Sequence, residues 1–360
     1  MPFDRGSFAV KILKLTKDLP EDILERFNKN CAGKLDEVKD EPQIGWISGR
    51  HLLERNIDEE TAILGGHIYL NLRIAQRKIP TSLLKAEMKL EELAYIKATG
   101  KADVPRKVKK DIKIAVEEKR MPQMVPTITG IPFVIDKRDN TIYLGTSSRS
   151  QADTFIAMFE KTFEYIPLEM TAEDLMLKEK INPTKYEGMF LFNKDGKDFV
   201  PGRDFLTWLW YFSEEEKGEV EVKGHGKFSV MLDGPLTFIA DGDGALETAV
   251  KKGNPLKSAE AKAALKVGKK LKKAKIIMAR DDETWSAGFD SDNFTFSGVT
   301  LPEGEEMEYN SRFAERVDSL QAFKGVFEEL FSIFIKETIS TEWAKKIEKI
   351  KTWIEKRETL

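Results

Sequence analysis

The feature of the sequence that most constrains the fold is a pair of helical patterns that interrupts a series of strand patterns. Residues 68–74 alternate between aliphatic and mostly polar or aromatic side chains, a period of two that predicts a strand. Helical spacing follows over 81–99, which Gly100 ends, and again over 105–120. Residues 130–146 then predict a β-hairpin. A helical pair between a strand and a hairpin indicates a finger inserted into a sheet.

The rest of the chain mixes strand and helix patterns without a short repeat. This mixture, with its hairpins, predicts an α+β fold of mostly antiparallel sheets flanked by helices. The remaining expected strands lie at 8–15, 44–47, 220–240, 276–279, 285–289 and 294–299, and the remaining expected helices at 20–27, 148–163, 171–180, 204–216, 258–273, 312–338 and 341–357.

These elements group into four regions along the 360 residues. We expect a central α+β domain, a helical finger, a second α+β region and a C-terminal helical pair, in an elongated molecule. The predicted boundaries are 1–80 with 123–200 for the central domain, 81–122 for the finger, 201–308 for the second region and 309–360 for the C-terminal helices.

Composition excludes several classes of protein. The single Cys31 excludes an internal disulfide and a zinc site built from several cysteines, and a total of three histidines argues against a His-rich metal site. No apolar stretch approaches the roughly 20 residues that a bilayer span needs. The first residues show no cationic flank followed by an apolar run. We therefore expect a cytoplasmic protein with no cofactor and no membrane partner.

The net charge of −3 hides an uneven distribution. Residues 251–275 hold ten Lys and one acid, and residues 97–120 hold nine Lys or Arg and four acids. These two segments together carry +14, so the remainder of the chain carries −17. Localised cationic surfaces on an acidic body suit a polyanion, although a lysine-rich helix is also often just a solvated face.

Each basic segment predicts a helix with cations along one face. In the expected helix 258–273, five lysines follow helical spacing, and like charges packed this way repel unless an anion relieves them. Aromatic residues do not interleave either face, which favours contact with a phosphate backbone over base reading. The predicted DNA contacts are Lys262, Lys266, Lys269, Lys270 and Lys273 in one segment and Arg106, Lys107, Lys109, Lys110 and Lys113 in the other.

Catalytic motifs are sparse. The sequence holds no phosphate-binding Gly-x4-Gly-Lys-Ser/Thr and no His-Glu-x-x-His. Residues 241–244 resemble part of a calcium loop but lack its other ligands, which favours a turn. Glu219 and Glu221 precede Lys223 in an expected strand, an arrangement that nucleases use to hold a metal and polarise a phosphate. A metal-dependent nuclease therefore stays an alternative.

The C-terminal helices support a third possibility, a protein-interaction module. Apolar residues of the helix at 312–338 alternate spacings of three and four, as in a coiled-coil seam. They are Leu320, Phe323, Phe327, Leu330 and Phe334, and Trp343, Ile347, Ile350 and Ile354 continue the pattern on the next helix. The partner of this seam can be the body of the chain, a second subunit or another protein.

Several short motifs, in order and spacing, give the chain a family resemblance over about residues 40–170. They are Ile44-Gly45-Trp46, then Arg77-Lys78-Ile79-Pro80 leading into Leu83-Leu84-Lys85-Ala86-Glu87-Met88, and Phe133-Val134-Ile135-Asp136 with Thr141-Ile142-Tyr143-Leu144 before Ser148-Arg149-Ser150-Gln151. This succession resembles the RdgC family of recombination-associated proteins.

The resemblance implies a nucleoid-associated protein that binds double-stranded DNA without sequence preference. It also implies a ring-shaped homodimer, of which this chain would form half, and restraint of RecA by occupation of DNA. It adds Arg77 and Lys78 to the predicted DNA contacts and implies no catalytic residue, although the family has also carried an exonuclease label. Residues 124–129 depart from the aromatic and basic run that other members carry near a ring contact.

Overall fold

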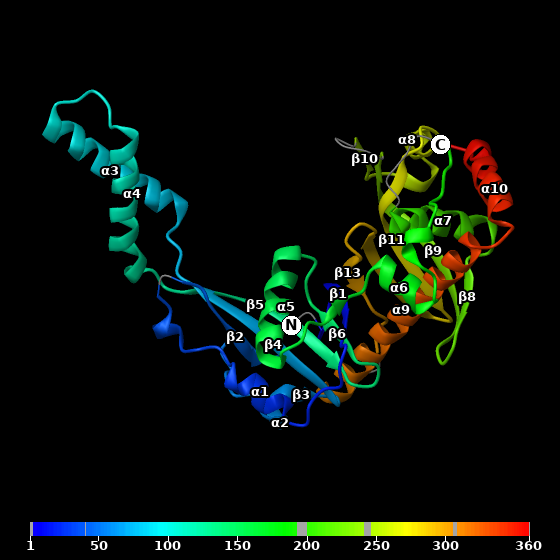
Figure 1. Ribbon diagram of the computed structural model, residues 1–360, viewed down its shortest axis with the longest axis horizontal. Coiled ribbons are helices and arrows are strands. Elements are labelled where there is room, and N and C mark those ends of the chain that lie inside the picture. Colours follow the sequence, from blue (N-terminus) through cyan, green and yellow to red (C-terminus); the bar gives the residue numbers. More distant parts are fainter. Residues whose placement is uncertain (1–2, 40, 193–199, 241–245, 305–307, 360) are drawn as a thin grey trace.

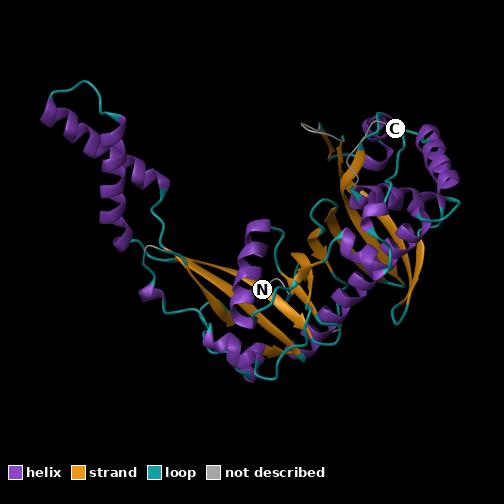
Figure 2. Cartoon of the chain, viewed as in Figure 1, coloured by secondary structure: helices purple, strands orange, loops and turns teal. Residues whose placement is uncertain are grey.

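The computed structural model describes residues 3–39, 41–192, 200–240, 246–304 and 308–359. The predicted turn at 241–244 therefore lies outside the described residues. The predicted α+β class is confirmed, because helices flank one large antiparallel sheet (Figures 1 and 2). Its main path runs β10-β9-β11-β12-β13-β1-β6-β5-β4-β2, so strands from both ends of the chain form one continuous layer.

The N-terminal half contributes one end of this layer and the helices around it. Its strands are β1 Phe8–Lys14, β2 Gln43–Ser48, β3 Ile63–Leu64, β4 His67–Gln76, β5 Thr127–Asp136, β6 Thr141–Leu144 and β7 Leu168–Glu169. Its helices are α1 Ile23–Lys29, α2 Glu59–Ala62, α3 Thr81–Thr99, α4 Arg106–Arg120 and α5 Arg149–Phe163, with short 3-10 turns η1 Leu35–Glu37 and η2 Met121–Gln123.

The C-terminal half continues the same sheet through the pairing of β13 with β1. Its strands are β8 Glu219–Val222, β9 Gly226–Ile239, β10 Glu247–Val250, β11 Lys270–Arg280, β12 Glu283–Asp290 and β13 Thr295–Thr300. Its helices are α6 Ala172–Lys178, α7 Pro201–Glu215, α8 Ala259–Lys266, α9 Tyr309–Thr338 and α10 Trp343–Lys356, with 3-10 turns η3 Pro183–Lys185 and η4 Pro255–Lys257.

The alternation in β4 places its side chains in two different cores. Ile68, Leu70 and Leu72 join a cluster with α1 and α5, whereas Tyr69 belongs to the larger cluster and packs near Phe313 of α9 with ring centroids 4.9 Å apart. The polar members Asn71 and Arg73 are buried too, because loop backbone covers them: Asn71 donates to the carbonyls of Ser48 and Gly49, and Arg73 to those of Gly33 and Leu52. The period of two is thus correct, but the expected contrast between a buried and an exposed face is absent from this strand.

The apolar seam of α9 packs inside the chain. Phe327 is fully buried, and its ring centroid lies 5.4 Å from that of Phe205 in α7 and 4.9 Å from those of Phe289 and Phe296 in β12 and β13. A seam covered in this way is not available to a second subunit. Of the partners that the sequence leaves open, the body of the chain is the one observed.

Helices α3 and α4 form the inserted pair between β4 and β5, which are neighbours in the sheet. Gly100 ends α3 in the left-handed region, with φ of 68°, and donates its N–H to the carbonyl of Ile96. The pair projects away from the sheet (Figure 1). We call residues 81–122 the finger, and all the predicted domain boundaries stay predictions.

The prediction of one helix over 258–273 is wrong. Helix α8 ends at Lys266, Gly268 adopts a φ of 83°, and β11 begins at Lys270. A left-handed residue ends a helix readily when it is glycine. The N–H of Leu271 then donates to Thr207 of α7, which starts the new strand on a buried partner.

Candidate nucleic-acid interface

The first two turns of α4 carry the densest exposed positive charge on the finger. Residues 106–113 hold five cations and one acid, and the first turn contains no acid. Arg106, Lys107, Lys110 and Lys113 are exposed, and Lys109 is half-buried. The ion pairs here are long, 3.7 Å from Lys109 to Asp103 and 3.6 Å from Lys113 to Glu117. We call these five cations the α4 basic face.

The helix dipole adds to this charge. Unsatisfied backbone N–H groups give the first turn of a helix a partial positive charge, which disfavours cations there. Pro105, at the cap of α4, offers no side-chain oxygen to its N–H groups. The α4 basic face therefore combines side-chain and backbone potentials of the same sign, and an anion would stabilise both.

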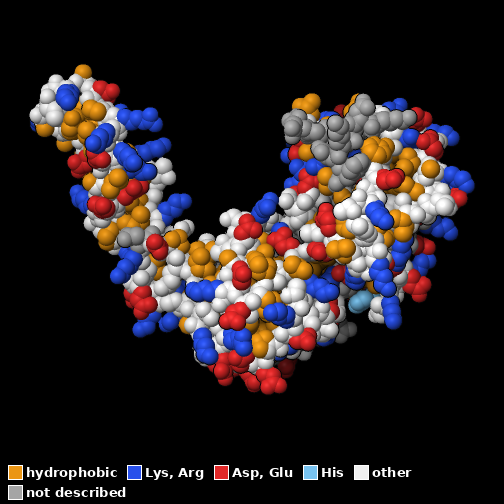
Figure 3. Space-filling model, in the orientation of Figure 1, with side chains coloured by type: hydrophobic (Ala, Val, Ile, Leu, Met, Phe, Trp, Pro, Cys, Tyr) orange, Lys and Arg blue, Asp and Glu red, His pale blue; other side chains and the backbone are white. Residues whose placement is uncertain are grey.

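A hollow separates the finger from the C-terminal half of the molecule. The chain curves so that the finger stands on one side and β10, α8 and α10 stand on the other (Figure 1). Lys and Arg side chains project from the finger toward this hollow (Figure 3). A long polyanion lying in the hollow would meet the finger on one side and the C-terminal half on the other.

The second predicted basic face does not exist as one surface. Lys270 is only 5% exposed and forms a 2.8 Å ion pair with Asp204, so its predicted surface position is wrong. Lys273 pairs with Asp290 at 2.8 Å, and the hydrogen bond between them raises the pKa of Lys273. Lys262 donates to the carbonyl of Arg357, and Lys269 donates to Thr248. Intramolecular partners thus neutralise or occupy most of this set.

A smaller group of lysines stays exposed in the same segment. Lys251, Lys252, Lys257 and Lys266 are exposed, and within the described parts of the chain none of them takes part in an ion pair of 4.0 Å or less. The first three precede α8, in the part of the basic segment for which the sequence predicts no helical face. The sequence does not show which lysines of the segment are exposed, so it does not separate these three from the paired lysines.

Arg77 and Lys78, adjacent in sequence, have different surroundings. The Arg77 guanidinium is half-buried and donates to the carbonyls of Val38, Pro122 and Met124. Lys78 is exposed. Of the two predicted DNA contacts, only Lys78 presents its charge to solvent without such partners among the described residues.

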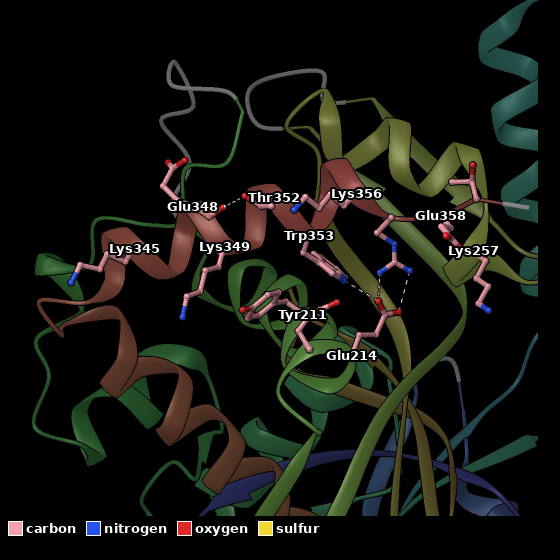
Figure 4. Close-up of a pocket in the computed structure, with 13 residues that line it drawn as sticks. Tyr211, Glu214, Lys257, Lys345, Glu348, Lys349, Thr352, Trp353, Lys356 and Glu358 are labelled. Atoms are coloured by element: carbon pink, nitrogen blue, oxygen red, sulfur yellow. Dashed lines mark hydrogen bonds and ion pairs between the residues drawn. The ribbon is translucent and has the colours of Figure 1, made fainter.

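An open groove of about 960 Å³ lies where α10 crosses the end of α7. Figure 4 shows Lys345, Lys349 and Lys356 along α10, together with Trp353 of the same helix and Tyr211 of α7. The sequence does not predict this groove, because its lining comes from segments far apart in the chain. Its charges are mixed, since Glu214, Glu215, Glu348 and Glu358 line it together with Lys257, Lys345, Lys349, Lys356 and Arg357.

A cluster around Arg357 forms part of the wall of this groove. Its guanidinium lies 4.4 Å from the ring centroid of Trp210 and 4.7 Å from that of Trp353, and it pairs with Glu214. Both indole N–H groups donate to the same carboxylate, at 2.8 and 3.0 Å. With these partners satisfied, the cluster fixes the C-terminal end of α10 to α7.

Of the candidate nuclease residues, Glu219 and Glu221 lie on the edge strand β8, and Lys223 lies in the turn after it, exposed to solvent. Glu219 and Glu221 are exposed, but Lys227 of the neighbouring strand pairs with Glu219 at 2.7 Å and lowers its pKa. In the described ranges, no three His, Cys, Asp or Glu side chains come close enough together to hold a metal ion. The carboxylate partner that this alternative requires is therefore not supplied by the described part of the fold.

Fold and surface together define an α+β protein with a projecting cationic finger, a form suited to binding a polyanion. Over its described residues, no helix is both long and apolar enough to cross a membrane. The predicted family resemblance is confirmed for residues 10–181, just under half of the chain, which match the family described as "Putative exonuclease, RdgC". This match covers the β1–β6 layer, the finger and α5.

A named relative gives a more limited match. The recombination-associated protein RdgC of Pseudoalteromonas atlantica is 24% identical over 115 residues. That segment is 32% of this chain and 38% of the relative, so the chain aligns with well under half of the relative's length. The C-terminal α7–α10 region lies outside the family match.

Proposed function

We propose that this protein binds double-stranded DNA without sequence preference and acts in recombination by occupying DNA. The observation that carries the proposal is the α4 basic face, which lies on a projecting finger inside the matched region. We further propose a nucleoid location, a homodimer and restricted RecA access to the occupied DNA. The recombination role draws support from the relative's name and from the family match.

Contact with the phosphate backbone is the mode that this surface favours. The α4 basic face consists of four Lys and one Arg, and lysine acts as a point charge that approaches phosphates from any direction. Sequence reading requires pairs such as Arg with guanine or Asn with adenine at base edges. Arg106 alone does not supply such a set, so we expect affinity to vary little with sequence and strongly with salt.

A duplex lying in the hollow would also meet cations on the side opposite the finger. Lys251, Lys252 and Lys257 are exposed close before α8, on the side of the hollow opposite the finger. Cations on both sides would hold a duplex more firmly than one face alone, because each neutralised phosphate releases counterions. The acidic remainder of the surface would disfavour other modes of contact.

The test compares two variants that lose the same charge. One carries Arg106→Gln, Lys107→Gln, Lys110→Gln and Lys113→Gln, and the control carries Lys29→Gln, Lys34→Gln, Lys217→Gln and Lys223→Gln, all of them exposed. Lys29 ends α1, Lys34 precedes η1, Lys217 precedes β8 and Lys223 follows β8, and both α1 and β8 lie on the outer side of the curve (Figure 1). Gln keeps a helix propensity close to that of Lys.

We expect the α4 variant to bind a duplex more weakly at every sequence tested. The slope of log affinity against log salt should become shallower by roughly one unit for each phosphate that the variant no longer neutralises. Fluorescence anisotropy of a labelled duplex at several salt concentrations measures both quantities. Equal weakening in the two variants would show that only net charge matters, and unchanged binding by the α4 variant would exclude the finger as the binding surface.

A further inference from the structure

The base of the finger contains one side chain that joins three separate backbone segments. Arg77 Nε donates to the carbonyl of Val38 at 2.7 Å, and Arg77 Nη1 donates to the carbonyls of Pro122 and Met124 at 2.5 and 2.8 Å. Arg77 stands where the chain enters the finger, and Pro122 and Met124 stand where the chain leaves it. Val38 belongs to neither connection and is itself buried.

Packing within the finger gives its orientation little support. No residue of α3 is buried, and α4 buries only Val116. Leu90, Leu93 and Ile114 remain 66%, 52% and 44% exposed. The helices are joined to each other by the ion pair of Arg120 with Glu87. These contacts hold α3 to α4, but they do not fix the pair against the sheet.

We propose that Arg77 is a positioning residue that fixes the direction in which the finger leaves the sheet. We call the Arg77 guanidinium with the three carbonyls it contacts the Arg77 latch. Because the guanidinium is planar and carries N–H groups on three nitrogens, it can reach carbonyls on different segments at the same time. The carbonyl of Val38 lies on the body of the molecule, outside the finger. The carbonyls of Pro122 and Met124 lie on the connection whose position the latch would fix.

Lysine cannot replace arginine in this role. The latch uses two nitrogens that point in different directions, whereas lysine carries all its donors on one nitrogen. Arg77→Lys therefore keeps the charge and removes the latch. The neighbouring Lys78 provides the opposite control, because Lys78→Gln removes one charge at an exposed position and leaves the latch intact.

The first experiment measures amide hydrogen exchange on the unsubstituted 360-residue chain and on the three variants Arg77→Gln, Arg77→Lys and Lys78→Gln. We expect exchange in residues 121–127 to accelerate about tenfold or more in both Arg77 variants and to stay unchanged in Lys78→Gln. Slow exchange in β4, β5 and β6 would show that each variant keeps its folded sheet.

The second experiment measures orientation directly. With Cys31→Ser to remove the native thiol, spin labels at positions 101 and 34 report the distance between the finger loop and the body. We expect broader distance distributions in both Arg77 variants than in the parent and in Lys78→Gln. The proposal would be overturned if Arg77→Lys showed the exchange rates and distances of the parent protein. It would also be overturned if Arg77→Gln left both quantities unchanged. Neither readout involves DNA, so a failed DNA-binding proposal would leave this test intact.

Discussion

Two lysines four positions apart show how burial divides residues that look alike in sequence. Lys270 pairs with Asp204, which is fully buried and also accepts hydrogen bonds from Tyr186 and the N–H of Met189. Lys266, at the end of α8, is exposed. We expect Lys270→Met to lower the free energy of unfolding by about 3–5 kcal/mol, because it leaves a buried carboxylate without its cation.

Lys266→Gln is the matched change, and we expect it to alter the free energy of unfolding by no more than about 0.5 kcal/mol. Urea denaturation of both variants measures the difference. Equal stabilities would contradict the buried ion pair. No sequence pattern separates the two lysines, because the partner of Lys270 comes from α7, 66 positions earlier in the chain.

At the scale of elements, α9 was predictable as a helix, but its spacing alone did not decide whether its partner is the body of the chain or another protein. Its seam has the spacing of a coiled coil, and the same spacing serves a helix packed on a sheet. We expect Phe327→Ala to lower the free energy of unfolding by about 3–5 kcal/mol, because it removes a ring that packs on Phe205, Phe289 and Phe296. The association state of the folded protein should stay unchanged.

Chemical denaturation gives the first quantity, and sedimentation under native conditions gives the second. A change in association with unaltered stability would instead place the seam at a subunit contact.

Among the other elements, the β5–β6 hairpin, α3 and α5 were predictable because local signals mark their ends, such as Gly100 after α3 and the Ser148 hydroxyl that accepts the N–H of Gln151.

The 258–273 segment shows where such local reasoning fails. Its lysines follow helical spacing, which favours a helix, whereas the acids that pair with Lys270 and Lys273 lie on α7 and β12 and cannot be identified from the segment itself. Tertiary pairing decided the outcome, since β11 lies between β9 and β12 and its register buries alternate residues. The same limit applies to the candidate interface. The cations of the α4 basic face lie on one helix and could be predicted from local spacing, whereas the exposure of the lysines before α8 could be seen only in the folded structure.

For the whole molecule, the exposed apolar residues of the finger bear on self-association. Leu90 and Leu93 project from α3 at 66% and 52% exposure on an element that packs on little of its own chain. We expect the protein to sediment as a dimer, at about twice the 41.0 kDa of one chain, and Leu90→Gln with Leu93→Gln to shift it toward the monomer. Leu53→Gln with Leu177→Gln, at 58% and 59% exposure elsewhere, should leave the dimer intact. A parent protein that sediments as a monomer at tens of micromolar would refute the homodimer, and a dimer that survives both pairs of changes would place the contact away from the finger.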